Sequence, residues 1–82
     1  MTPAEARAAI LLIFCGDRSN LTVDMWKTIR RGQPAHEPMS ETLFRLAGIP
    51  YPGPDYVGRH PESIRLLVSA AAAAEALEVD HG

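Results

Sequence analysis

The side chains that most often carry out chemistry are few in this chain and far apart in its sequence. The three histidines, His36, His60 and His81, fall in predicted loops or at the terminus, without the helical i, i+4 spacing of a metal site. His36-Glu37 and His60 could meet in space as an acid–base pair, but surface histidines in loops are the simpler interpretation. Cys15 lies in an apolar run, so it is interpreted as a buried structural thiol rather than a nucleophile, which needs an accessible, electropositive setting.

Sequence motifs for metal, cofactor or phosphate binding are also missing. The chain has no cysteine cluster for zinc, no acidic loop with calcium spacing, no nucleophile elbow and no phosphate-binding glycine loop. We therefore predict a protein that is not an enzyme and that needs neither a metal nor a cofactor. The lone cysteine favours a reducing, cytoplasmic setting. The N-terminus does not resemble a signal peptide, and the apolar run at 8–15 is too short to span a bilayer, so no membrane partner is expected.

What remains as a candidate for function is the only cluster of positive charge. Residues 18–35 contain four cations, Arg18, Lys27, Arg30 and Arg31, against the single acid Asp24, although the whole chain has a formal net charge of −2. A solvated helix face, with cations where the helix dipole favours them, is the simplest interpretation. The functional alternative is a basic face that meets a larger molecule.

These residues must be positioned by helices, because start and stop signals for helices recur along the chain. Thr2-Pro3-Ala4-Glu5 is a capping box with proline at the first helical position, Thr22 and Ser40 are predicted N-caps, and Gly32 and Gly48-Ile49 are predicted stops. A chain of 82 residues is enough for one domain, here residues 1–82. The prediction is a small all-α fold with the first and last helices packed around two short central ones. The expected helices are residues 3–15, 23–31, 41–47 and 61–79, with a crossing loop at 50–60.

Three stretches leave structural alternatives open. The run at 9–15 is apolar on every side, which also fits a buried strand, but the upstream cap and Gly16 favour a helix that something else must cover. Residues 50–61 contain four prolines and two glycines, so we expect no helix there, but an ordered loop pinned by Tyr51 and Tyr56 or else a flexible linker. The alanines at 70–74 allow another helix to approach closely. We therefore predict a homodimer through the first helix and the alanine-rich last helix.

Residues 20–49 resemble part of a known family. The segment LTVDMWKTIRRG, residues 21–32, resembles the recognition helix of the Cro/XRE-type helix-turn-helix repressors, with Thr22, Trp26, Ile29 and Arg31-Gly32 matching in kind and spacing. Residues 38–47, PMSETLFRLA, are similar to the family's next helix, whose common form is P-S-x-E-T-L-x-R-L-A. The scaffold helix that precedes the recognition helix in that family has no recognisable counterpart in residues 11–20.

The resemblance implies a small transcriptional regulator that binds double-stranded DNA. In that family the recognition helix enters the major groove, and neighbouring cations contact the backbone. The residues that the resemblance places against base edges are Thr22, Val23, Asp24 and Lys27, and those that it places against phosphates are Arg18, Arg30 and Arg31.

A protein-binding module is the alternative. Small acidic helical chains with an over-apolar helix often dimerise or cover part of a larger protein. A phage-type inhibitor, such as an anti-CRISPR or anti-defence protein, or an adaptor would fit this size and this lack of catalytic groups. Its contact would be the face of Lys27, Arg30 and Arg31 or the loop with Tyr51 and Tyr56, because Tyr and Arg are typical interface anchors.

Overall fold

The computed structural model describes residues 1–16, 21–57 and 60–80, and within these ranges the regular structure is helical. The helices are α1 (Pro3–Phe14), α2 (Val23–Arg31), α3 (Met39–Ala47), the single-turn α4 (Pro54–Val57) and α5 (Pro61–Asp80). The predicted all-α fold is therefore confirmed. The apolar run that also fitted a strand is helical as far as Phe14, and the third helix begins at Met39 rather than at residue 41.

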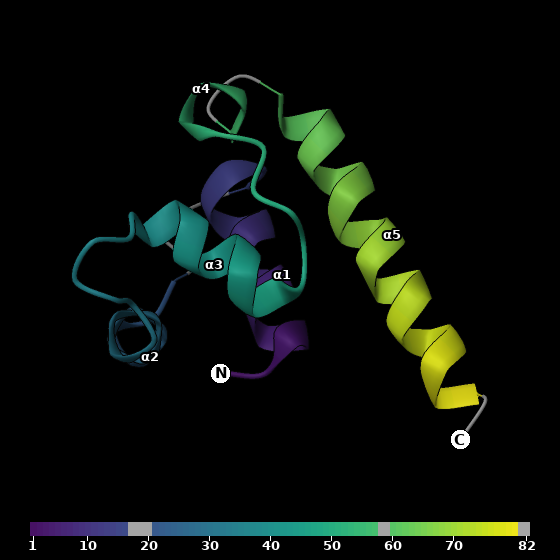
Figure 1. Cartoon of the computed structure of the whole chain (residues 1–82), viewed down its shortest axis with the longest axis horizontal. Coiled ribbons are helices and arrows are strands. Elements are labelled where there is room, and N and C mark those ends of the chain that lie inside the picture. Colours follow the sequence, from purple (N-terminus) through teal and green to yellow (C-terminus); the bar gives the residue numbers. More distant parts are fainter. Residues whose placement is uncertain (17–20, 58–59, 81–82) are drawn as a thin grey trace.

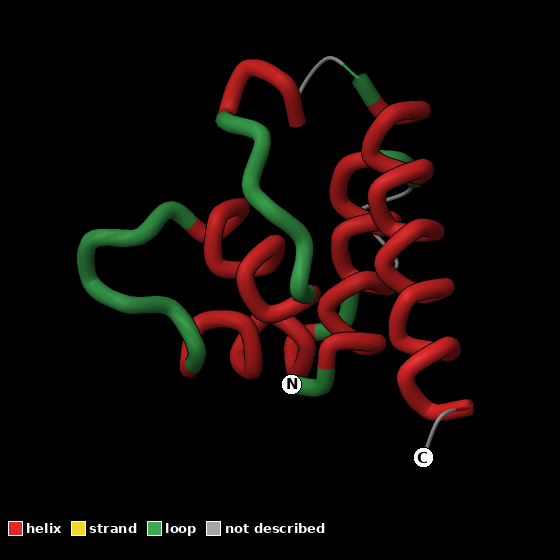
Figure 2. The backbone as a smooth tube through the Cα atoms, turned by 45° about the vertical axis from the view of Figure 1, so that its right-hand side comes forward, coloured by secondary structure: helices red, strands yellow, loops and turns green. Residues whose placement is uncertain are grey.

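Helices α1 and α3 form the centre of the fold. α1 packs against α3 and also against α5, while α2 packs on α3 (Figure 1). Figure 2 shows α5 running along one side of the molecule. The predicted arrangement, in which the first and last helices enclose the two short ones, is wrong, because α1 itself lies between α3 and α5. The buried core consists of Ala6, Ala9, Ile10, Leu21, Ile29, Leu43, Phe44, Ala47, Ile49, Ile64 and Val68.

The signals at the start of α1 and at the end of α3 act as the sequence predicts. At the start of α1 the Thr2 hydroxyl accepts from the Glu5 amide at 3.2 Å, and the Glu5 carboxylate accepts from the Thr2 amide at 3.1 Å, which completes the capping box. At the end of α3, Gly48 adopts φ 76°, a left-handed conformation that glycine adopts without steric cost. The Ile49 amide then reaches the Phe44 carbonyl at 2.9 Å, as in a Schellman motif, and the Ile49 side chain enters the core.

The start of α3 differs from the prediction. Ser40 does not cap the helix, because Pro38 occupies the N-cap position and contributes no side-chain hydrogen bond. The Ser40 hydroxyl instead pairs with the Tyr51 hydroxyl at 2.9 Å. This bond joins α3 to the segment that follows it.

The proline-rich segment contains a helical turn that the sequence analysis did not expect. Residues 54–57 form α4, so the prediction of no helix between residues 50 and 60 is wrong there. Pro54 occupies the first position of this turn, where its missing N–H needs no partner. Tyr51 and Tyr56 pack against the core, as predicted, and the Tyr51 ring meets the Phe44 ring edge-on at a centroid distance of 5.6 Å.

Candidate binding surface

Helix α2 presents three cations of the predicted cluster to solvent. Lys27, Arg30 and Arg31 are all exposed, and neither of the ion pairs that the structure shows among its described residues involves them. Val23, which is 68% exposed, shares a helix face with Lys27 and Arg30 because the three are spaced at i, i+4 and i+7. In Figure 1 this helix lies at the edge of the molecule.

The opposite side of α2 anchors it to the domain. Ile29 is fully buried, and Met25 and Trp26 are half-buried against the core. The Thr22 hydroxyl accepts from the Met25 amide at 3.2 Å, which confirms Thr22 as the N-cap. α2 is therefore an amphipathic helix, whose apolar side packs against the core and whose cations are exposed to solvent.

Two pockets adjoin the cationic side of α2, and they share Trp26 and Met39. One, of about 350 Å³, is lined by Val23, Trp26, Lys27, Arg30 and Met39. The other, of about 200 Å³, is lined by Ile13, Phe14, Trp26, Met39, Ser40 and Leu43. We call the residues that line these two pockets the α2–α3 face. Its walls are mainly apolar, its rim carries two cations, and none of the acidic residues that the structure describes lines either pocket.

A network centred on Glu37 holds α2 against α3. The Thr42 hydroxyl, fully buried, donates to the Glu37 carboxylate at 2.6 Å, and Arg45 forms an ion pair with the same carboxylate at 3.2 Å. Arg45 also donates to the carbonyl of Gly32, the residue that ends α2, at 3.0 Å. The side-chain amide of Gln33 donates to the Glu37 carbonyl at 2.9 Å. These hydrogen bonds fix the loop between the two helices and hold α2, which contributes Trp26 to both pockets, against α3, which contributes Met39.

This network makes stability depend on pH. The hydrogen bond from Thr42, and then the one from Arg45, lowers the pKa of Glu37 below its usual value. Because the folded-state pKa is the lower one, Glu37 contributes stability above its unfolded pKa, about 4.3. That contribution is lost as the pH falls through the depressed folded pKa. We expect Glu37→Gln to lower stability at pH 7 and to have a smaller effect at pH 3, measured by urea unfolding at both pH values.

Glu5 provides the matched control for that measurement. Its pKa is also lowered, chiefly by the hydrogen bond with the backbone of Thr2, but it caps α1 and makes no contact with the Glu37 network. Glu5→Gln should therefore reduce the acid sensitivity of the domain without moving the amide resonances of residues 32–38. Equal destabilisation by Glu37→Gln at both pH values would show that charge at residue 37 is unimportant.

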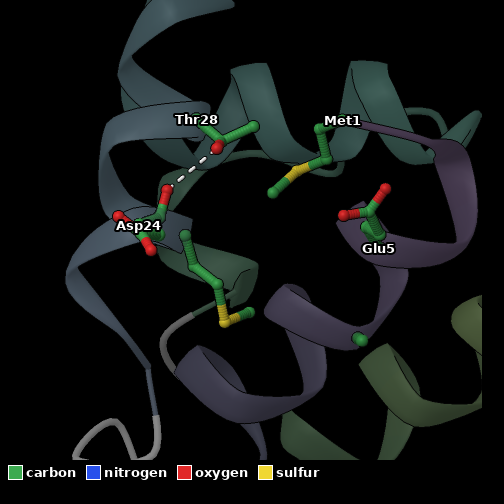
Figure 3. Close-up of a pocket in the computed structure, with 6 residues that line it drawn as sticks. Met1, Glu5, Asp24 and Thr28 are labelled. Carbon is green, nitrogen blue, oxygen red and sulfur yellow. Dashed lines mark hydrogen bonds between the residues drawn. The ribbon is translucent and has the colours of Figure 1, made fainter.

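A pocket separates part of α1 from part of α2. A pocket of about 270 Å³ lies between them, with Met1, Glu5 and Ala8 on the α1 side and Asp24, Met25 and Thr28 on the α2 side (Figure 3). The Thr28 hydroxyl donates to the Asp24 carbonyl at 2.8 Å, within α2 itself. The support of α2 therefore comes chiefly from α3, whereas a helix-turn-helix unit rests its recognition helix on the helix that precedes it.

The predicted site residues separate into three groups. Val23, Asp24, Lys27, Arg30 and Arg31 are exposed on α2, together with the cap Thr22. Tyr51 and Tyr56 are half-buried, and the Tyr56 ring stacks near the His60 ring at a centroid distance of 4.6 Å. Arg18 lies outside the described residues. The lining of the pockets was not predicted from the sequence, where the one available signal was Met39, an apolar residue at the start of α3.

Two of the candidate catalytic residues, Cys15 and Glu37, make structural contacts. The Cys15 thiol donates to the Pro61 carbonyl at 3.3 Å, so Cys15 helps to join the end of α1 to the start of α5. Glu37 binds Thr42 and Arg45 rather than a histidine. Within the described ranges, no three His, Cys, Asp or Glu residues lie close enough to hold a metal ion.

Comparison with protein-family models, with curated proteins and with solved structures finds no match to this chain. In the part of the chain that the structure describes, no helix combines the length and the apolar character that crossing a bilayer requires. The feature of the described residues from which a function can be inferred is therefore the α2–α3 face.

Proposed function

We propose that this chain is a non-enzymatic binding module whose α2–α3 face receives an acidic, amphipathic segment of a larger protein. The observation that carries the proposal is the pair of pockets that meet at Trp26 and Met39 beneath a rim of Lys27 and Arg30. An apolar side chain of the partner fills a pocket, and its carboxylates lie against the cations.

The residue types on this face are those that interfaces use. Trp and Arg are the most common residues at binding hot spots, and methionine adapts its shape to different apolar partners. Cations at the rim of an interface raise the rate of association with an acidic partner and select against basic ones. Amphipathic helices commonly bind in this way, with apolar residues at i, i+3 or i+4 and i+7 placed in a groove. An inhibitor or an adaptor would use such a face in the same manner.

Double-stranded DNA is the second candidate ligand, and one observation favours it. A helix at the edge of the molecule exposes Lys27, Arg30 and Arg31 together, as contacts with the phosphate backbone of DNA require. A phosphate backbone, however, makes no use of the apolar pockets, and the exposed Asp24 would be repelled by it. The two ligands also differ in salt dependence, since duplex binding weakens steeply as counterions are added.

Photo-crosslinking from the rim of the larger pocket tests the proposal. A photoreactive amino acid replaces Val23, which lines that pocket, and a matched variant carries it at Leu11, an exposed apolar residue of α1. In cells that produce the protein naturally, we expect a single crosslinked protein from position 23 and none from position 11. The same product from both positions, or crosslinks from position 23 to DNA alone, would overturn the proposal.

A further inference from the structure

Helix α5 buries only one of its faces within the chain. Ile64 is fully buried and Val68 is 6% exposed where α5 packs on α1, and Glu75 on the same face forms an ion pair with Arg7. On the opposite face Leu66 is 71% exposed and Leu77 is 61% exposed. Figures 1 and 2 both show α5 at the side of the molecule, with the other helices on one flank only.

The exposed apolar residues of α5 are spaced symmetrically along the helix, so the face can pair with a second copy of itself. Leu66, Ala70, Ala73 and Leu77, which we call the α5 stripe, are all exposed and follow one another at intervals of four, three and four residues. These intervals are those of the a and d positions of a heptad, the pattern by which two helices pack side by side. The intervals read the same in both directions, so a two-fold axis between Ala71 and Ala72 superimposes the stripe on itself. An interface between identical subunits requires such self-complementarity.

We propose that the α5 stripe pairs with the α5 stripe of a second copy of this chain, in an antiparallel dimer. Leu66 of each copy then lies opposite Leu77 of the other, and Ala70 lies opposite Ala73. The small alanines at the centre let the helix axes approach closely, while the leucines close the two ends. The α2–α3 face takes no part in this interface, so the inference does not depend on the proposed function.

Electrostatics favours the antiparallel direction. Glu78 lies in the C-terminal half of α5, where the helix dipole disfavours anions, and no basic residue occupies the last turn, whereas Glu75 is already paired with Arg7. Antiparallel pairing sets the negative end of each helix dipole alongside the positive end of the other, where the N-terminal half carries both Glu62 and Arg65. Parallel pairing would set the two negative ends together.

The size of the interface indicates a dimer that dissociates on dilution. The surface area buried when one stripe of a single helix pairs with its copy lies at the low end of the ~1,200–2,000 Å² that stable complexes bury. α1 adds little to this surface, because it packs against α3 and α5, and Leu11 is 36% exposed. Where the dimer forms, it carries two α2–α3 faces, which would increase avidity for a partner with repeated sites.

Sedimentation velocity over a range of concentrations tests the pairing. We expect a monomer–dimer equilibrium for the natural chain and a dissociation constant at least about tenfold higher for Leu66→Glu, because the new carboxylate must be desolvated in the interface. Val23→Glu is the matched control, since Val23 is 68% exposed but lies on α2, and it should leave the dimer unchanged. Circular dichroism verifies that each variant keeps its helices. A natural chain that stays monomeric up to millimolar concentration, or one whose dimer Leu66→Glu leaves intact, overturns the proposal.

Disulfide trapping tests the direction of pairing. Two chains are prepared with Cys15→Ser, which replaces the thiol that donates to the Pro61 carbonyl with a hydroxyl donor. One chain also carries Leu66→Cys and the other Leu77→Cys. In the antiparallel dimer we expect the mixed 66–77 disulfide on oxidation. The two positions 66 would be ~16 Å apart along the helix axis, beyond the reach of a disulfide. Disulfides of 66 with 66 and of 77 with 77, or no disulfide at all, overturn the antiparallel arrangement.

Discussion

Replacing Phe44 with alanine is expected to lower the free energy of unfolding by about 3–5 kcal/mol, the range measured for large aromatic residues in protein cores. Phe44 is fully buried in α3, and its ring lies 6.1 Å from the Phe14 ring and 5.6 Å from the Tyr51 ring between centroids. It therefore joins α1, α3 and the proline-rich segment. Because small domains are stable by only about 5–15 kcal/mol in total, this loss removes a large fraction of the stability of the domain. Urea denaturation followed by circular dichroism measures the loss.

Phe44→Leu is the control for this experiment. Leucine keeps the position apolar and fills most of the space, so we expect a clearly smaller loss than for alanine. If Phe44→Ala cost less than about 1 kcal/mol, the described packing of α1 on α3 could not be the centre of the fold.

Reversing one charge at the rim of the larger pocket should have the largest effect on binding. Arg30 lines that pocket together with Trp26 and Met39, so Arg30→Glu places a carboxylate against the partner's acidic groups. We expect the affinity for the protein captured at position 23 to fall by about tenfold to a hundredfold, equivalent to about 1.4–2.8 kcal/mol. Isothermal titration calorimetry with that protein measures the change.

Arg31→Glu distinguishes the two candidate ligands. It makes the same change of charge on the next residue, which is exposed but does not line either pocket of the α2–α3 face. For a protein partner we expect Arg31→Glu to weaken binding much less than Arg30→Glu. For duplex DNA the two variants should weaken binding alike and lower the salt dependence alike, because both cations would serve phosphates. Equal effects of the two variants on the captured protein would count against the pockets as its binding site.

Much of the fold follows from local signals that the sequence carries. The capping box at Thr2 and the Schellman stop at Gly48 each depend on residues within one turn of the helix end, and both were predictable. The start of α3 was not, because the serine at position 40 forms its bond with Tyr51, eleven residues further along. The Glu37 carboxylate likewise takes Arg45 as its partner across the first two turns of α3. Such competition between partners is decided by the folded geometry.

The candidate site was predictable only on its exposed side. Charge spacing placed Lys27, Arg30 and Arg31 outward, since Ile29 and Trp26 had to face the core. The pockets, in contrast, need Trp26 from α2 and Met39 from α3 together with Phe14 from α1, a combination that depends on how three helices pack. The resemblance to helix-turn-helix repressors uses caps and core positions within residues 20–49. Cap and core positions of this kind occur in any two short helices. They do not indicate the two pockets of the α2–α3 face.

The most direct test of the α2–α3 face is to titrate the isotope-labelled chain with a designed acidic amphipathic helical peptide and, separately, with duplex DNA, while recording backbone amide spectra. We expect the peptide to shift the resonances of Val23, Trp26, Lys27, Arg30 and Met39 and to leave those of α5 in place. We expect duplex DNA at physiological salt to cause no comparable shifts. If the peptide leaves the resonances of these five residues unchanged, or if DNA shifts those of Asp24, Lys27 and Arg31 with a steep loss on adding salt, the α2–α3 face is not the binding site for an acidic segment of a protein.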